Sequence, residues 1–430
     1  MKSVHRIWCI VIFVILACTS LLVASLVLKS YDNYPKFKPF FIDKKTEYDA
    51  YFFGASNALN GIFPMQLWEN HRITSYNFAW HKSSIALDYW LLRLTSRMKK
   101  PKIVFIDIFG IDGEQKIDKN LYYAHGALDL FPLSAEKLCA INDLFDTPAK
   151  KAEFIFPFYL YHNSWKTTSL PTIKSNTRHF LTKRDALIPT RGGELRVGTT
   201  YPETFDTDVR DFSETEPLSF KYAKKIISFC RENDILPVFM LVPYPTQDAL
   251  DEWKDSFIRL LEKEKVDFLD LSCAVDFDTD KFDRFAHLNP SGASKVTEQI
   301  GAYILKSAEA IGASEKDGDT RVLWEKDLAR YHAFYDGKII DETHFSNLLT
   351  LLSNQAYKAD IFVSDGVELG EIEKKLINQM GKNVTVHIGQ KADADIKIKV
   401  FKAKSPQKDG TTDETFFCEK SFRAQTIKIQ

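Results

Sequence analysis

Short apolar runs alternate with amphipathic stretches over residues 49–305, and this alternation predicts successive strands and helices. The apolar runs end in turn-forming or polar residues, whereas the longer stretches place apolar residues at helical spacing, as at Leu87, Leu91 and Leu94. The expected strands are 49–54, 73–78, 102–108, 236–242 and 266–271, and the expected helices are 83–98, 221–230, 253–261 and 294–305. Strands that alternate with helices pair in parallel through right-handed crossovers. We therefore predict an α/β fold with a doubly wound, five-stranded parallel sheet.

The pattern divides the chain into a larger and a smaller folded unit. Residues 46–314 carry the first pattern, and residues 113–215 interrupt it with aromatic and basic loops that are too long for a simple connection. We expect this insertion to lie on the substrate side of the fold. After about residue 315 the pattern changes, with expected strands at 357–363, 384–388 and 396–400 around an expected helix at 371–380. Residues 315–430 are therefore predicted to form a small C-terminal α/β domain.

The amino-terminal segment is long and apolar enough to cross a membrane. Residues 7–28 contain no charged side chain, and a helix of that length spans about 33 Å, against a hydrocarbon core of about 30 Å. Lys2 and Arg6 lie in the short head 1–6, which favours a cytoplasmic amino terminus and an extracytoplasmic remainder. A cleaved signal peptide is the main alternative, although no convincing small-x-small cleavage site follows. We predict a single-pass anchor in the cell membrane, joined to the folded part by a polar tether at 29–45.

Charge and cysteine content exclude several function classes. The chain has 430 residues with 57 Lys and Arg against 58 Asp and Glu, so no basic excess points to a nucleic-acid partner. The six cysteines form neither a CxxC pair nor a Cys/His cluster at zinc spacing. The sequence therefore gives no reason to expect a metal or a cofactor.

A serine and a histidine stand where catalytic groups collect in such a sheet. Ser56 follows the apolar run 51–53, at the edge where a parallel strand leads into a helix. Far downstream, His287 precedes the helix-starting residues 289–291. A serine hydroxyl needs a base to become a nucleophile, and histidine titrates in the range that suits this exchange. A helix-capping Ser56 and a buried, hydrogen-bonded His287 are the structural alternatives.

The order of an early Ser56 and a late Asp and His resembles the SGNH (GDSL-like) hydrolases. The resemblance covers about residues 45–310 and rests on short motifs. Within that superfamily the chain is most similar to membrane-anchored bacterial members of cell-envelope polysaccharide pathways, which include the D-alanine transfer protein of teichoic acid operons. The resemblance implies a flavodoxin-like SGNH fold, with Ser56 as nucleophile and His287 as general base.

The acid that should orient His287 does not stand at the usual position. The superfamily has Asp three residues before the His, whereas this chain has Arg284 there and Asp283 four residues before. A local bulge would let Asp283 reach the imidazole. Asp107 or Asp112 is the alternative orienting acid, and a solvated Asp283 is the structural alternative.

The expected oxyanion donors also depart from the family pattern. The backbone N–H of Ser56 is the first candidate, because amides at a helix start point toward a developing charge. The block at the end of the second strand, residues 75–80, contains Asn77, which the resemblance makes a second candidate. The block after the third strand reads Gly-Ile-Asp-Gly at 110–113, which puts Asp112 where the family has Asn. A carboxylate can donate a hydrogen bond only when it is protonated.

An aromatic cluster in the insertion is a candidate substrate wall. Residues 159–165 contain Tyr161, His162 and Trp165, which resemble a Tyr-His-x-x-Trp stretch of polysaccharide-linked members. Aromatic faces with polar tips suit sugar rings. Packing of the insertion is the alternative role for these side chains.

Two functions follow from the sequence. The first is a membrane-anchored acyl esterase or acyltransferase that acts on an ester-linked acyl group of a cell-envelope or exported polysaccharide through an acyl-serine on Ser56. The second is a non-catalytic carbohydrate-binding or scaffold subunit of a polysaccharide-modification complex, which Arg284 and Asp112 favour. Both imply a glycan ligand, a membrane location and other polysaccharide-modification proteins as partners.

Overall fold

The computed structural model describes residues 2–28, 34–109, 116–117, 121–161, 166, 169–181, 189–199, 217–244, 251–283, 287–308, 316–389, 394–403 and 414–423. Its central sheet has the order β2-β1-β3-β4-β5, and every pair of neighbouring strands is parallel. The strands are β1 (Ala50–Phe53), β2 (Ser75–Asn77), β3 (Ile103–Asp107), β4 (Leu236–Leu241) and β5 (Asp267–Asp270). The predicted five-stranded parallel sheet is confirmed.

Helices cover both faces of this sheet because side chains alternate between the faces along each strand. Phe52 and Phe105 belong to a cluster under one set of helices, whereas Phe53 and Val104 belong to a cluster under the other set. The first set is α3 (Ser56–Gly61), α4 (Pro64–His71) and α13 (Pro290–Lys306), and the second is α2 (Tyr34–Ile42), α5 (Ile85–Met98), α11 (Leu218–Glu232) and α12 (Asp251–Lys263). Two buried layers therefore hold the strand ends in place.

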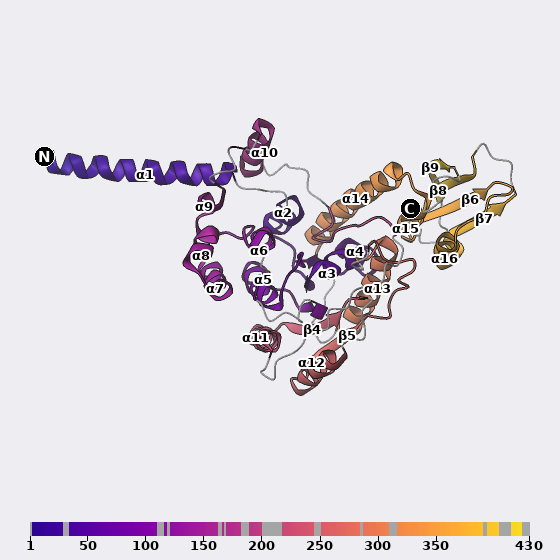
Figure 1. Cartoon of the computed structure of the whole chain (residues 1–430), viewed down its shortest axis with the longest axis horizontal. Coiled ribbons are helices and arrows are strands. Elements are labelled where there is room, and N and C mark those ends of the chain that lie inside the picture. The colour runs from indigo at the N-terminus through magenta and orange to yellow at the C-terminus, as the bar shows by residue number, and fades with distance from the viewer. Residues whose placement is uncertain are drawn as a thin grey trace.

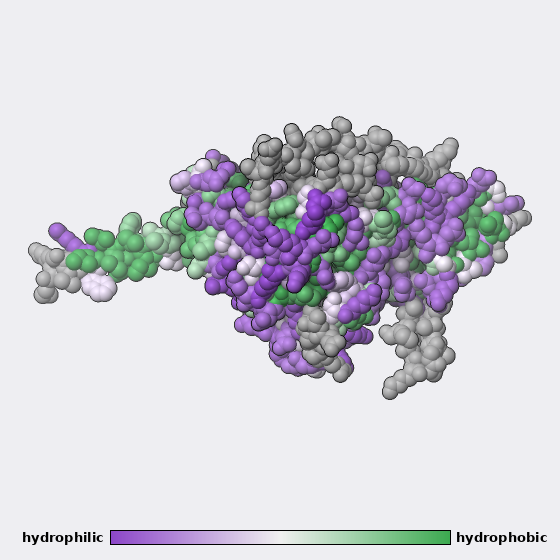
Figure 2. All heavy atoms as spheres, turned by 90° about the horizontal axis from the view of Figure 1, so that it is seen from below, coloured by the Kyte–Doolittle hydropathy of each residue, from purple (hydrophilic) through white to green (hydrophobic). Residues whose placement is uncertain are grey.

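The amino-terminal helix α1 (Lys2–Leu28) extends away from the body (Figure 1). Within it, His5–Ser25 is the one described segment that is long and apolar enough to cross a membrane, and of its side chains only Ser25 is buried. Its apolar side chains form the green projection in Figure 2. Where the sequence predicted a polar tether, the structure has α2, because Phe37 and Phe40 pack with Tyr76 and Phe78 of the core. The chain is thus bound to the sheet soon after the apolar helix ends.

Between β3 and α11 the regular elements of the described chain are all helices. The helices are α6 (Leu121–Leu128), α7 (Ala135–Leu144), α8 (Pro148–Ile155), α9 (Pro157–Tyr161) and α10 (Leu170–Leu181). Helices α9 and α10 contact α1 near its carboxyl end (Figure 1). This region of the predicted insertion therefore lies beside the candidate membrane helix.

A second sheet lies at the opposite end of the molecule from α1 (Figure 1). Its order is β7-β6-β8-β9, and only β6 and β7 are parallel. Its elements are α14 (Gly318–Asp341), α15 (Phe345–Leu352), β6 (Tyr357–Val363), α16 (Glu371–Met380), β7 (Val384–Ile388), β8 (Ile396–Ala403) and β9 (Glu414–Phe422). The expected β6, α16 and β7 coincide with the observed ones. The sequence analysis missed α14, α15 and β9.

Candidate active site

Ser56 lies at the first position of α3, two residues after a glycine that no other residue could replace without strain. Gly54 has φ of +143°, and a Cβ added to it would lie 2.5 Å from the Cβ of Asp107. The turn is further held by Trp80, whose backbone N–H donates to the Gly54 carbonyl at 2.9 Å. The glycine therefore lets β1 turn sharply into α3, and it leaves the Ser56 side chain partly exposed at the carboxyl edge of the sheet.

His287 and Asp283 lie in a loop that folds back on itself before α13. The backbone N–H of Phe282 donates to the His287 carbonyl at 2.6 Å, and Lys281 pairs with Leu288 as an isolated bridge. Asn289 closes the base of the loop: it caps α13 by accepting from Ser291 N–H at 3.0 Å. The loop is thus fastened to the helix that follows it.

Three side chains form a continuous hydrogen-bonded chain at this edge. Oγ of Ser56 lies 2.8 Å from Nε2 of His287, and Nδ1 of His287 lies 2.8 Å from Oδ2 of Asp283. The Asp283 carboxylate also accepts the backbone N–H of His287 at 3.3 Å. This is the arrangement in which an acid orients an imidazole and the imidazole takes a serine proton. Arg284 and Asp112 lie outside the described residues.

Asp107, an alternative acid in the sequence analysis, is engaged elsewhere. Its Oδ1 accepts the backbone N–H groups of Val242 at 3.2 Å and Phe109 at 3.3 Å, which ties the end of β3 to the end of β4. Its Oδ2 has no hydrogen-bond partner among the described residues. Burial raises the pKa of Asp107 to about 7, and the N–H donors oppose this rise. Asp283 is therefore the acid that the structure brings to the imidazole.

A second buried carboxyl, Asp88, supports the same turn and was missed in the sequence. It accepts the Ser83 hydroxyl at 2.6 Å and the backbone N–H of Gly54. Burial raises its pKa to about 7; the hydrogen bond from Ser83 opposes the rise, and the nearby Asp107 adds to it. A charged residue beside Leu87 and Leu91 in an expected helix was the available signal. Gly54 is thus flanked by two buried carboxyls.

Asn77, the second expected oxyanion donor, uses its donors to hold α3. Its side-chain amide donates to the carbonyls of Ala58 at 2.9 Å and Ile62 at 3.2 Å. Its backbone N–H donates to the backbone carbonyl of Arg191 at 3.0 Å. Its Oδ1 accepts the N–H of Ala79 at 3.0 Å. All three N–H groups of Asn77 are therefore engaged, and the residue holds α3 in place in this structure.

The described segment 189–199 connects the nucleophile helix with the histidine loop. The backbone N–H of Glu194 donates to the Leu59 carbonyl of α3 at 3.0 Å. Farther along, the Gly198 carbonyl accepts from Nδ2 of Asn289 at 3.1 Å. The side chains of Glu194 and Arg196 form an ion pair at 2.5 Å within this segment. The sequence analysis placed the segment only in the insertion, because nothing local reveals its two anchor points.

Arg191 in the same segment is a buried structural residue. Its guanidinium pairs with Asp43 at 3.1 Å and with Asp327 at 2.5 Å, and it stacks over Trp324 at 4.3 Å from the ring centroid. Gly192 follows with φ of +96°, where an added Cβ would overlap the Asn77 carbonyl. These contacts join the start of the core to α14.

The expected substrate wall is described only at Tyr161. Its hydroxyl donates to Asp129 of the α6–α7 connection at 3.3 Å, beside a buried pair of Asp129 and His125 at 3.1 Å. The ring of His125 stacks on Phe154 with 3.8 Å between centroids. His162 and Trp165 lie outside the described residues. The described hydrogen bond of Tyr161 is to Asp129, next to α6, and not to Ser56, His287 or Asp283.

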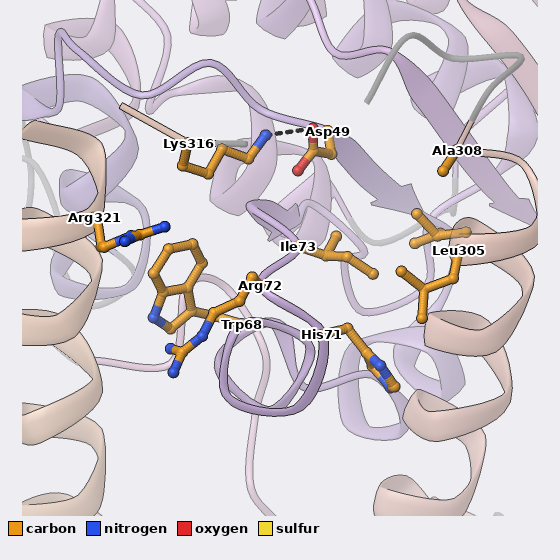
Figure 3. Close-up of a pocket in the computed structure, with 10 residues that line it drawn as sticks. Asp49, Trp68, His71, Arg72, Ile73, Leu305, Ala308, Lys316 and Arg321 are labelled. Carbon is orange, nitrogen blue, oxygen red and sulfur yellow. Dashed lines mark hydrogen bonds and ion pairs between the residues drawn. The ribbon is translucent and has the colours of Figure 1, made fainter. Parts of the chain in front are cut away.

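A cavity of about 290 Å³ lies near the opposite edge of the sheet, beside Asp49, which precedes β1 (Figure 3). Trp68 and Ile73 form its apolar wall. Lys316 contacts Asp49 at 2.5 Å, and Arg72 pairs with Glu325 at 2.6 Å. These paired groups stabilise the fold, and the described contacts do not connect this cavity to Ser56.

Among the described residues, no group of three or more His, Cys, Asp and Glu side chains is placed to hold a metal ion.

The comparisons with known proteins give a weak likeness to a solved structure. No family model matches the chain, and no curated protein matches its sequence. One similar solved structure is that of an active site mutant of a family two carbohydrate esterase from Clostridium thermocellum in complex with "celluohexase". The identity is 12%, the TM-score is 0.30, and the match covers 62% of this chain and 66%, just under two thirds, of the other.

Proposed function

We propose that this protein is a membrane-anchored serine enzyme that cleaves or transfers an ester-linked acyl group of a cell-envelope or exported polysaccharide. The observation that carries the proposal is the hydrogen-bonded chain from Asp283 through His287 to Ser56, with both contacts at 2.8 Å. Serine, imidazole and carboxylate in this order supply covalent acyl-transfer chemistry. Together with the family resemblance of the same residues, this geometry favours an enzyme over a scaffold.

In the proposed mechanism His287 removes the Ser56 proton as Oγ attacks the acyl carbonyl. The proton moves from Oγ to Nε2, and the imidazolium is stabilised by the Asp283 carboxylate at Nδ1. The backbone N–H of Ser56 is the proposed donor to the oxyanion. The imidazolium then protonates the departing sugar oxygen, which leaves the acyl group bonded to Ser56.

The second half of the reaction decides between an esterase and a transferase. His287 takes a proton from the incoming nucleophile, whose oxygen attacks the acyl-serine, and the imidazolium then gives this proton to Oγ of Ser56 as the bond to the acyl carbon breaks. Water gives hydrolysis, whereas a sugar hydroxyl gives acyl transfer. The outcome depends on water access to the acyl-enzyme, so we propose the reaction class without choosing the acceptor.

The proposed location follows from α1. The helix carries an apolar segment at His5–Ser25 with Lys2 and Arg6 at its amino-terminal end, which supports an anchor with the folded part outside the cytoplasm. In that compartment the accessible acyl esters include those of surface and exported glycans. The resemblance to polysaccharide-linked SGNH members supports the same substrate class.

Active-site labelling tests the proposal directly. Full-length protein in detergent micelles is treated with a fluorophosphonate, which reacts with serines that a base activates, and the adduct is mapped by peptide mass spectrometry. We expect the label on Ser56 and its loss in His287→Ala. Ser228, an exposed serine whose hydroxyl contacts Glu232, serves as the internal control and should remain unlabelled. A folded protein without a Ser56 adduct would argue against the enzyme.

A further inference from the structure

The buried Lys36 and the partly exposed Arg196 each carry a buried N–H group without an acceptor. Nζ of Lys36 on α2 and Nε of Arg196 have no hydrogen-bond partner among the described residues. More than nine in ten buried polar groups in proteins are paired, so two unpaired cationic donors in one neighbourhood require an explanation. Lys36 lies over the rings of Trp80 and Phe37 at 5.4 and 5.5 Å, and ring faces attract a cation but accept no ordinary hydrogen bond.

These groups lie beside both halves of the proposed catalytic chain. Glu194 forms an ion pair with Arg196 at 2.5 Å. The backbone carbonyl of Glu194 accepts a hydrogen bond from Nδ2 of Asn60, which lies one turn after Ser56 in α3. The Arg196 guanidinium lies 5.9 Å from the ring of Phe282, the residue before Asp283. Trp80, whose ring lies under Nζ of Lys36, donates its backbone N–H to the carbonyl of Gly54 in the turn before Ser56. The cluster therefore borders the site from the segment that joins α3 to the histidine loop.

The cluster contains three basic side chains and one carboxylate. Glu194 is the acid that influences Lys36, and it is already contacted by Arg196 at 2.5 Å and by His81 at 3.5 Å. Burial would raise the pKa of Glu194, but the hydrogen bond from His81 and the charges of Lys36 and Arg196 hold it at about 2. One carboxylate thus faces two cations and an imidazole. Burial lowers the pKa of Lys36 to about 7 against the attraction of Glu194, so an added anion nearby would favour its charged form.

We propose that Lys36 and Arg196 form a subsite for an anionic group of the substrate, a carboxylate or a phosphate, next to the acyl ester that Ser56 attacks. The inference rests on the proposed function and narrows its substrate to an acidic glycan. An anionic oxygen supplies the acceptors that Nζ of Lys36 and Nε of Arg196 lack. Lys36 is a positioning and specificity residue here, because it does not contact the reacting atoms.

The test compares acidic and neutral esters on full-length protein in detergent micelles. The substrates are an acetylated galacturonate oligosaccharide, an acylated glycerol phosphate and a neutral acetylated xylo-oligosaccharide. We expect Lys36→Met and Arg196→Gln to lower the ratio of kcat/KM for an acidic over the neutral ester at least tenfold, mainly through KM, because each removes a charged hydrogen bond. Arg196→Lys should retain more of the ratio. Lys374→Met and Arg330→Gln remove exposed cations of α16 and α14 and serve as matched controls.

A binding measurement separates this proposal from the enzyme proposal. Ser56→Ala protein is titrated with unacetylated galacturonate oligosaccharide, glycerol phosphate and inorganic phosphate, with and without Lys36→Met. Binding of an acidic ligand that Lys36→Met weakens tenfold supports the subsite, even if no ester is turned over. A ratio within twofold of wild type in both folded variants overturns it. Binding of inorganic phosphate without binding of the galacturonate oligosaccharide or glycerol phosphate would show an adventitious ion only and also overturns it. Binding that Lys36→Met leaves unchanged overturns it as well, because Lys36 would then not contact the anion.

Discussion

The Oδ2 atom of Asp283 lies 2.8 Å from Nδ1 of His287, four positions later in the same loop, and the same carboxylate accepts the His287 backbone N–H. The acid therefore holds both the ring and the main chain of the proposed base. Because Phe282 also bonds to the His287 carbonyl, the loop positions acid and base as one unit. A substitution at Asp283 should disturb orientation more than local stability.

Asp283→Asn should lower kcat about 10³–10⁴-fold, the scale seen when the orienting acid of a serine triad is neutralised. The amide leaves the geometry nearly unchanged but no longer stabilises the imidazolium. Initial rates on a small acyl ester measure the effect. The control is Asp278→Asn, which changes an exposed acid five residues before Asp283 and should keep nearly full activity. A loss confined to Asp107→Asn would make Asp107 the functional acid.

Ser56→Ala should remove turnover by several orders of magnitude, up to about 10⁶, because no other group supplies the covalent step. The fold should survive, since loss of one partly exposed hydroxyl usually costs little stability. Activity on a small ester and polysaccharide acylation in cells are measured together, with Ser228→Ala as the control. Normal acylation by a stably expressed Ser56→Ala protein would favour the scaffold function.

Asp107→Asn should weaken the dependence of stability on pH between about 4 and 7. The folded state holds the Asp107 proton up to a pKa of about 7, whereas the unfolded chain releases it near the usual value of 3.8. Since the folded state binds more protons in this window, its free energy of unfolding falls as pH rises and levels off above about 7. Asn cannot ionise, so the free energy of unfolding of the variant should rise relative to that of wild type as pH increases across this window.

Denaturant titrations at several pH values measure this difference. Asp278→Asn provides the control, because Asp278 is exposed and pairs with Lys375. Asp88 keeps part of the pH dependence in the variant, although its pKa should fall when the neighbouring Asp107 charge is removed. A constant stability difference between wild type and Asp107→Asn at all pH values would contradict the prediction.

Arg191→Met should destabilise the fold by about 3–5 kcal/mol, because it leaves the buried Asp43 and the largely buried Asp327 without their shared partner. Chemical denaturation of the full chain gives the value. Arg330→Met is the matched control: it also contacts Asp327, at 3.1 Å, but is half exposed and should cost less than about 1 kcal/mol. Equal effects of the two variants would show that burial of the Arg191 pair is not the cause.

The large domain should be accessible from outside the cytoplasmic membrane. We expect protease added to spheroplasts to digest the chain beyond α1, because the positive head at Lys2 and Arg6 favours a cytoplasmic amino terminus. A cytoplasmic marker protein must stay intact as the control for lysis. Protection of the domain until detergent is added would reverse the topology.

Local hydrophobic periodicity was sufficient to predict most of the regular elements. Hydrophobic spacing predicted the five parallel strands and the helices between them, and it predicted β6, α16 and β7 at their observed bounds. Ser56 and His287 were also found from the sequence, because each stands beside a turn where a strand or loop leads into a helix. Such signals lie within a few residues along the chain.

Which polar groups meet depends on contacts between distant parts of the chain. Asp283 was the expected acid, with Asp107 and Asp112 as alternatives, and the contacts of the loop before α13 bring Asp283 to the ring. The side-chain amide of Asn77 donates to carbonyls at α3 and just after it, and the residues next to Asn77 in the sequence do not reveal these partners. A hydrogen bond acts over about 3 Å, so its partner depends on chain segments far apart in sequence, whereas hydrophobic periodicity is written in adjacent residues.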